Sequence, residues 1–276
     1  MISVLICAKN EEKRIRDCIE SVLIENPDEV ILVDGDSIDS TVEIAKSYGL
    51  KVIKTKNSNL TRDRQIGIDA CKNDLIAMID SDHRLKSGAL DGLKNDLIEF
   101  DLDIVQAALS IMPIGFLCKG EKQYIDLILN KAGEKKMIGV APCLYRKKVF
   151  DSVKFDDNIT STIDDTDFMY RLSLQRIYKI GTGHTSISSL HDSGFVSYFN
   201  KFKWYGRGDG EFCIKHPKRA LGMLFHLIVR YPVLYSIRAA LSGQFTAIPY
   251  VIFQGFTRVT FLFVRLIKLR FGVGLK

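Results

Sequence analysis

The sequence predicts an α/β fold in which a mostly parallel central sheet is flanked by helices. Short apolar segments alternate with helical segments over residues 2–80, which is typical of repeated strand–helix–strand units. Acidic residues directly follow two of the apolar segments, which places charge at the ends of buried strands. The chain has 276 residues, 46% of them hydrophobic and 26% charged, a composition that supports a core and excludes a disordered or collagen-like chain.

Each predicted element follows from its residue pattern. The strands are the short and nearly continuous apolar runs at residues 2–7, 30–33, 51–53 and 75–79. Helices are predicted between them at residues 15–23, 41–48 and 64–71, where apolar residues recur at helical intervals. Asp39, Ser40 and Thr41 are typical of the start of the second helix, and Gly49 is typical of its end.

Polar residues follow three of these strands, where ligands bind in a parallel sheet. The segments are Ala8-Lys9-Asn10, Asp34-Gly35-Asp36 and Asp80-Ser81-Asp82. An anionic nucleotide would be repelled there without a divalent cation, and Asp80 and Asp82 offer the oxygen ligands that Mg²⁺ and Mn²⁺ prefer. The same D-x-D pattern also occurs in solvated turns. The sequence contains neither G-x-G-x-x-G nor G-x-x-x-x-G-K-[ST], which disfavours dinucleotide enzymes and P-loop ATPases.

Four segments, in this order, resemble the motifs of the family-2 glycosyltransferases of GT-A fold. They are Ile2–Glu11, Val33–Thr41, Arg64–Ile68 and Asp80–Asp82. The resemblance continues through Tyr145-Arg146 and Asp164–Leu172 and covers about residues 2–210. It implies an inverting, membrane-associated glycosyltransferase with a nucleotide-diphosphate sugar as donor and Mn²⁺ or Mg²⁺ as cofactor.

The resemblance also implies which residues bind the donor. Those expected beside the nucleotide base and ribose are Ala8, Asn10, Glu11 and Asp34. Arg64 would lie against the donor, near its phosphates or ribose. Asp80 would hold the ribose or the metal, while Asp82 would be a metal ligand.

Asp164 and Asp165 occupy the position of the acidic pair of inverting members, whose second carboxylate is the general base. Transfer to a hydroxyl needs a carboxylate beside the acceptor oxygen, because a proton must leave as the new bond forms. Asp165 is therefore the expected catalytic residue. The alternative is that both carboxylates only supply negative charge to the first turn of a helix that ends near Arg176.

Two later residues are further candidates. His191 follows a predicted strand at residues 185–190, and in GT-A enzymes a late histidine often completes the metal shell. The alternatives are a partly buried histidine bonded to the backbone, or His184 in the same role. Arg207 would reach the donor diphosphate or line a solvated helix face. The Q-x-x-R-W motif of processive relatives is absent from the sequence, which argues against a polymer synthase.

Charge is distributed unevenly along the chain. Residues 212–276 contain ten Lys and Arg and no Asp or Glu, whereas residues 1–211 hold 29 bases and 33 acids. Ala239–Thr257 is free of charge over 19 residues but contains Gly, Pro, Gln and Ser, which suits an interfacial or re-entrant hairpin better than a spanning helix. We therefore expect a catalytic domain at residues 1–211 and a basic, helical, membrane-associated tail at 212–276. A single transmembrane pass and a subdomain packed on the catalytic core are the alternatives.

The resemblance, together with the basic tail, implies a hexosyl- or N-acetylhexosaminyltransferase at the cytoplasmic face of the cell membrane. Six scattered cysteines without a C-x-x-C pair agree with a reducing compartment. The expected partners are the nucleotide-sugar donor, a lipid-linked or cell-surface glycan acceptor and an anionic membrane surface, with no nucleic acid; the oligomeric state is not predicted. Two alternatives are a polyprenyl-phosphate glycosyltransferase, whose anionic acceptor needs no base, and a catalytically silent nucleotide-sugar-binding protein.

Overall fold

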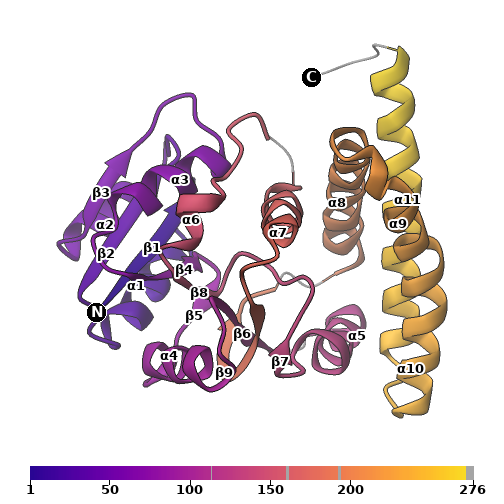
Figure 1. Ribbon diagram of the computed structural model, residues 1–276, viewed down its shortest axis with the longest axis horizontal. Coiled ribbons are helices and arrows are strands. Elements are labelled where there is room, and N and C mark those ends of the chain that lie inside the picture. Colours follow the sequence, from indigo (N-terminus) through magenta and orange to yellow (C-terminus); the bar gives the residue numbers. More distant parts are fainter. Residues whose placement is uncertain (113, 160–161, 192–193, 272–276) are drawn as a thin grey trace. The chain divides into compact units, whose positions relative to one another are not determined.

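A computed structural model describes residues 1–112, 114–159, 162–191 and 194–271 (Figure 1). The chain divides into two compact units. The first comprises Met1–Ile111, Leu129–Thr160 and Asp164–Leu190, and the second comprises Met112–Ile128, Ser161–Ile163 and His191–Lys276. The first unit contains the sheet, and the second is helical. The predicted boundary at residue 211 falls inside helix α8 (Phe195–Lys215), and the functional division at that point stays a prediction.

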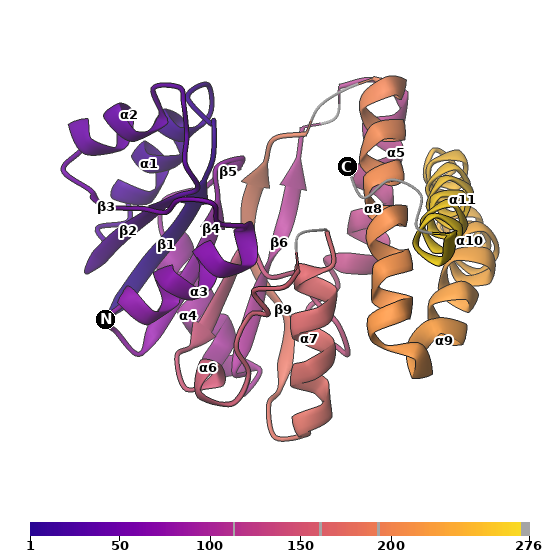
Figure 2. The same ribbon diagram turned by 90° about the horizontal axis from the view of Figure 1, so that it is seen from above.

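The four predicted strands are confirmed and form a parallel half-sheet (Figure 2). They are β1 (Ile2–Ala8), β2 (Glu29–Asp34), β3 (Lys51–Lys54) and β4 (Leu75–Asp80). Their order is β3-β2-β1-β4, with every neighbouring pair parallel. All seven residues of β1 are buried, as expected for a strand that is covered on both faces.

Beyond β4 the sheet becomes mixed. The order continues through β8 (Cys143–Arg146), β6 (Ile104–Ile111), β9 (Ile180–Ser189) and β5 (His83–Arg84), while β7 (Gly133–Glu134) pairs with β9. Strand β8 runs antiparallel to both of its neighbours, whereas β6 and β9 are parallel to each other. The α/β class is confirmed, and its sheet is parallel through β4 and partly antiparallel beyond it.

Helices cover both faces of this sheet over two apolar cores. Helices α1 (Ile15–Leu23), α2 (Thr41–Ser47) and α4 (Ala89–Glu99) bury residues in one core. Helices α3 (Leu60–Ala70), α6 (Val149–Ser152) and α7 (Asp164–Gln175) bury residues in the other. Helix α3 begins before the predicted residue 64, because the Asn59 side chain accepts a hydrogen bond from the Arg62 amide at 2.9 Å and caps an earlier turn.

The second unit consists of helices. Helix α5 (Phe116–Tyr124) leads into η1 (Ile125–Leu129), and α8 packs along α11 (Ala247–Phe271). A Cβ on Gly206 would lie 2.4 Å from the Arg258 carbonyl oxygen, so glycine permits this close approach. Between α8 and α11 lie η2 (Pro217–Arg219), α9 (Ala220–Phe225), η3 (His226–Tyr235) and α10 (Ser236–Leu241).

The C-terminal helices form a hairpin. Pro217–Leu241 and Ala247–Phe271 are each long and apolar enough to cross a membrane, judged by length and composition. The chain turns between them at Gly243, whose φ of 68° favours glycine. The charge-free stretch at residues 239–257 is therefore divided by this turn and does not form one helix.

Candidate functional site

The strand ends bring the predicted polar residues of the first unit to one edge of the sheet (Figure 2). In the parallel register Ala8 lies opposite Asp34, and Cys7 lies opposite Asp80. Asp34 is buried, while Asp80 is half-buried. Asp34 and Asp80 are almost fifty residues apart in the sequence. In the sheet only strand β1 separates the two strands that they end.

A buried arginine joins two acidic segments at this edge. Arg64, in α3, forms an ion pair with Asp164 at the start of α7, and its Nη2 lies 3.4 Å from Oδ1 of Asp80. The Arg64 side chain is only 4% exposed. Burial alone would lower the pKa of Arg64, but the charges of Asp80 and Asp164 raise it above its usual value. The guanidinium therefore stays charged and holds the end of β4 next to the acidic pair.

Asp165 differs from Asp164 in its environment. It is half-buried, and its Oδ1 accepts hydrogen bonds from the Thr166 amide at 2.5 Å and the Thr166 hydroxyl at 3.1 Å. Burial, together with the neighbouring charge of Asp164, raises the pKa of Asp165 to about 6. A carboxylate with such a pKa is ionised near neutral pH and is basic enough to take a proton from a reacting hydroxyl.

The turn after β4 has the donor chemistry of a hard-metal site. Single ligand atoms of Asp80, Asp82 and His83 lie within 4.8 Å of one another. The two carboxylates fit Mg²⁺ or Mn²⁺, which prefer oxygen ligands.

The imidazole of His83 is placed differently from a ligand. Its Nδ1 accepts a hydrogen bond from the Asp80 amide at 3.0 Å, so in the neutral ring the proton is on Nε2. That Nε2 lies 3.8 Å from Oδ1 of Asp82. His83 therefore stabilises the turn through the Asp80 amide, while its Nε2 lies beyond hydrogen-bond distance of Asp82. No sequence pattern singles out this residue, although it directly follows Asp82.

The loop after β1 is held against the loop after β2. Asn10 has a φ of 57°. Its side-chain oxygen accepts a hydrogen bond from the Ile38 backbone amide at 2.9 Å, and its backbone amide donates to the Ser37 hydroxyl at 2.8 Å. Glu11 is half-buried, and burial raises its pKa above the usual value. A cavity of about 290 Å³ is lined by Asn10, Glu11, Glu12, Lys13, Arg14 and Asp39.

His191 and Arg207 belong to the second unit. The buried carboxylate of Glu121, which no sequence pattern singles out, orients His191. Nδ1 of His191 lies 2.8 Å from Oε2 of Glu121 in α5. Glu121 also accepts hydrogen bonds from Tyr198, Lys201 and Tyr250 at 2.7, 2.9 and 3.1 Å. Burial would raise the pKa of Glu121, but the His191 hydrogen bond and the Lys201 charge lower it to about 2. Arg207 is exposed on α8.

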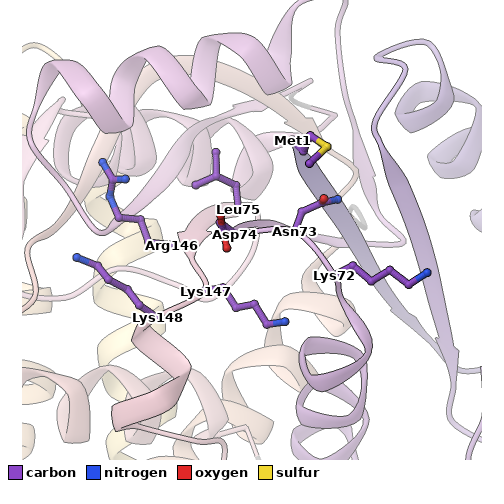
Figure 3. Close-up of a pocket in the computed structure, with 8 residues that line it drawn as sticks. All are labelled: Met1, Lys72, Asn73, Asp74, Leu75, Arg146, Lys147 and Lys148. Carbon is purple, nitrogen blue, oxygen red and sulfur yellow. The ribbon is translucent and has the colours of Figure 1, made fainter.

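A larger hollow lies at the opposite edge of the sheet (Figure 3). Its volume is about 510 Å³, and it is lined by Met1, Lys72, Asn73, Asp74, Leu75, Arg146, Lys147 and Lys148. Met1 precedes β1 and Leu75 begins β4, so this hollow lies beside the amino ends of the strands. Lys147 donates to the Cys71 carbonyl, and Lys148 pairs with Asp103. The predicted site residues lie elsewhere.

Comparison with known proteins identifies the family. The model of glycosyl transferase family 2 matches residues 3–152, more than half of the chain. This chain belongs to that family. An uncharacterised glycosyltransferase of Rickettsia typhi is 29% identical over 230 residues, which cover 79% of this chain and 70% of the relative. The predicted family and the glycosyltransferase class are confirmed.

Solved structures show the same fold. S. aureus TarS (residues 1–349) in complex with UDP-GlcNAc has a TM-score of 0.55 and 15% identity, covering 100% of this chain and 93% of that chain. GalNAc-T7 with UDP, GalNAc and Mn²⁺ has a TM-score of 0.58 and 13% identity, covering 76% of this family-2 glycosyltransferase and 50% of GalNAc-T7. The predicted GT-A fold is confirmed.

Proposed function

We propose that this family-2 glycosyltransferase moves a sugar, with inversion, from a nucleotide-diphosphate sugar to a hydroxyl of a lipid-linked or cell-surface glycan. The observation that carries the proposal is the double ion pair of Arg64. Arg64 holds Asp80, the first residue of the acidic turn, close to Asp164. Asp164 directly precedes the proposed base, Asp165. The groups proposed for departure of the nucleotide therefore lie near the group proposed for deprotonation of the acceptor.

The donor and the metal are supported by the site and by its structural neighbours. The UDP-GlcNAc in the TarS structure and the UDP and Mn²⁺ in the GalNAc-T7 structure support a nucleotide-sugar donor and a divalent cation here as well. Asp80 and Asp82 would hold Mg²⁺ or Mn²⁺, which when bound neutralises the charge of the leaving diphosphate. Ala8, Asn10, Glu11 and Asp34 would bind the nucleoside.

Asp165 is the proposed general base. Its raised pKa gives it basicity, and the hydrogen bonds from Thr166 fix the orientation of its carboxylate. Its neighbour Asp164 is occupied by Arg64, so the two adjacent carboxylates have separate tasks. As Asp165 removes the proton, the acceptor oxygen can attack the anomeric carbon from the side opposite the departing diphosphate, which inverts that carbon.

His191 and Arg207 are proposed as a further metal ligand and a diphosphate contact. Nδ1 of His191 is held by Glu121, and an oriented second shell is typical of metal-binding histidines. His191→Ala should weaken Mn²⁺ binding, and Arg207→Ala should weaken nucleoside diphosphate binding, both measured by calorimetry. Unchanged affinity in either variant would remove that residue from the site.

The C-terminal hairpin is proposed to lie on the cytoplasmic face of an anionic membrane. The hairpin exposes many large apolar side chains, among them Leu221, Phe225, Ile237, Leu241, Phe245 and Phe256. Exposed bases, including Lys218, Arg230, Arg238 and Lys268, accompany them, and residues 212–276 contain no Asp or Glu. Apolar side chains with cations suit a lipid interface whose phosphates are negatively charged.

A donor panel tests the proposed reaction. The full chain is incubated with Mn²⁺, membrane lipid extract and sugars linked to different nucleoside diphosphates, and release of nucleoside diphosphate is measured. One donor should be consumed only when acceptor extract is present, and chelation should stop its turnover. Binding of nucleotide and metal without consumption of any donor would favour a catalytically silent binding protein.

A further inference from the structure

The hollow at the amino ends of the strands, which the proposed reaction does not use, is lined by an excess of positive charge. Four of its eight lining residues are basic, namely Lys72, Arg146, Lys147 and Lys148. Asp74 is the only acid among the described residues that line it. Its volume of about 510 Å³ falls within the range of about 300–1,000 Å³ that is typical of small-molecule sites. Size and charge together suit a small anion.

Two neighbouring segments of the first unit supply these bases (Figure 3). Lys72 belongs to the segment between α3 and β4, whereas Arg146 ends β8 and two lysines follow it. Leu75 pairs with Arg146 in the antiparallel ladder of β4 and β8, so the two segments lie side by side. In the close-up Lys72 and Arg146 lie on opposite sides, with Asp74 between them. The positive charge is therefore distributed around the hollow and not confined to one side.

Two of the bases already have partners within the protein. Lys147 donates to the Cys71 carbonyl at the end of α3, and Lys148 pairs with Asp103 at 2.8 Å. The Lys148 side chain is exposed, and an ion pair in water is weak, so this lysine can turn toward another anion at little cost. Both lysines add positive charge to the hollow without being its principal donors.

Lys72 and Arg146 keep donors for a ligand. Nε of Arg146 donates to the Leu102 carbonyl at 3.2 Å, which orients the guanidinium. In the part of the chain that the structure describes, neither the Nη atoms of Arg146 nor Nζ of Lys72 form a hydrogen bond or an ion pair. The guanidinium and the ammonium therefore offer several N–H donors to the hollow and no acceptor.

We propose that this hollow binds a phosphate-bearing anion, with Arg146 and Lys72 as its principal contacts. Four positive charges around one small hollow repel one another, and a phosphate group would reduce this repulsion. A guanidinium can bind two phosphate oxygens through parallel hydrogen bonds, and a lysine adds a compact charge on a flexible chain. The phosphate belongs either to a soluble compound or to a lipid headgroup, which share this chemistry.

The basic hollow is separate from the edge at which the proposed function places the donor. Leu75 begins β4 and Asp80 ends it. With a rise of about 3.3 Å per residue, these two residues are roughly 16 Å apart. The carboxylates around Asp80 repel an anion unless a divalent cation is bound there. Phosphate binding without a divalent cation therefore reports on the basic hollow alone.

Calorimetric titration of the full chain with pyrophosphate in metal-free buffer tests this assignment. Wild type should bind one pyrophosphate per chain, with an affinity that falls as the salt concentration rises. Lys72→Gln and Arg146→Gln should each weaken binding about threefold, and the double variant about tenfold, as expected for partly exposed charge pairs. Lys94→Gln is the matched control and should leave the affinity unchanged, because Lys94 is exposed on α4 and does not line the hollow.

Vesicles distinguish the two sources of phosphate. If a lipid headgroup occupies the hollow, the double variant should sediment less than wild type with phosphatidylcholine vesicles that contain phosphatidic acid, and pyrophosphate should reduce sedimentation of the wild type. Equal sedimentation of both proteins, together with weakened pyrophosphate binding by the double variant, assigns the hollow to a soluble phosphate compound.

Four outcomes would overturn the inference. The first is failure of the wild type to bind pyrophosphate in metal-free buffer, and the second is equal affinity of wild type and Lys72→Gln, whose side chain has no hydrogen bond to lose. An equal loss of affinity in Lys94→Gln would mean that net charge alone attracts the anion. Binding that requires Mn²⁺ and is lost in Asp82→Asn would place pyrophosphate at the acidic turn, which supports the proposed function and overturns this inference alone.

Discussion

Replacing Asp165 with asparagine separates binding from catalysis in the proposed reaction. The amide oxygen of the substituted side chain could still accept the hydrogen bond that Thr166 donates to Oδ1 at 2.5 Å, so the local geometry is retained. A positioned general base contributes about 10²- to 10⁴-fold to a rate. We expect kcat to fall about 10³-fold, equivalent to about 4 kcal/mol of transition-state stabilisation, with little change in donor affinity. Release of nucleoside diphosphate measures the first quantity and calorimetry the second.

The pH dependence of the same variant supplies a second measurement. Because burial and Asp164 raise the pKa of Asp165 to about 6, wild-type turnover should fall as the pH drops through that value, and the variant should lack this dependence. A carboxyl pKa raised from 3.8 on folding also stabilises the protonated form. That contribution is complete below pH 3.8 and is lost as the pH rises through about 6. The melting temperature of Asp165→Asn at pH 7.5 should therefore equal or exceed that of wild type.

Asp164→Asn is the control variant, because it makes the same substitution at the adjacent carboxylate, which pairs with buried Arg64. Removing one partner of a buried ion pair typically costs about 3–5 kcal/mol, and the remaining contact of Arg64 with Asp80 places this change at the lower end. Asp164→Asn should thus lower the melting temperature where Asp165→Asn does not. Turnover of Asp165→Asn within tenfold of wild type, with an unchanged pH profile, would refute the base assignment and favour an acceptor that is already an anion, such as a polyprenyl phosphate.

Three further variants test other parts of the structure. His83→Asn keeps an acceptor for the Asp80 amide but removes the imidazole whose Nε2 lies 3.8 Å from Oδ1 of Asp82. It should weaken Mn²⁺ binding several-fold with an unchanged melting temperature. A loss of stability that matches the loss of Mn²⁺ affinity would make His83 structural only. Glu121→Gln should destabilise the protein by about 1.5–3 kcal/mol at neutral pH, measured by urea unfolding, because it weakens charge-assisted hydrogen bonds. The pKa of Glu121 is lowered from 4.5 to about 2, so this difference should shrink as the pH falls through that interval, and a pH-independent difference would contradict it. Leu241→Glu with Phe245→Glu should reduce sedimentation of the full chain with phosphatidylglycerol-containing vesicles, whereas equal binding to neutral and anionic vesicles would contradict an electrostatic contribution.

The parallel half of the fold could be predicted from sequence because its signals are local. Each of the strands β1 to β4 is an apolar run that is short and bounded by polar residues, and the helix between each pair carries its own periodicity. Strand β8 lacks such a signal. It is inserted between β4 and β6 by antiparallel pairing with segments about forty to seventy residues away, and only tertiary packing selects that position.

The chemistry of the site was predictable by residue type and only partly by arrangement. The acidic turn at Asp80 and the acidic pair at Asp164 were found as separate patterns. Their connection through Arg64 depends on contacts across 16 and 100 residues, which spacing does not encode. His83 directly follows the predicted residue Asp82. Its significance comes from its burial and from the hydrogen bond that it accepts from the Asp80 amide, neither of which one sequence contains.

The balance of charge at the strand ends explains why these features occur together. Asp34, Asp63, Asp80, Asp82, Asp164 and Asp165 all lie at this edge or at the start of α3 and α7 in the first unit. Arg64 supplies one buried positive charge against them, and it is already engaged by two of the six. Carboxylates so close to one another repel unless further cations or hydrogen-bond donors reduce the repulsion. A divalent cation at the turn after β4 would reduce this repulsion at Asp80 and Asp82, of which Arg64 pairs only with Asp80. The excess of negative charge at this edge therefore supports the proposed metal.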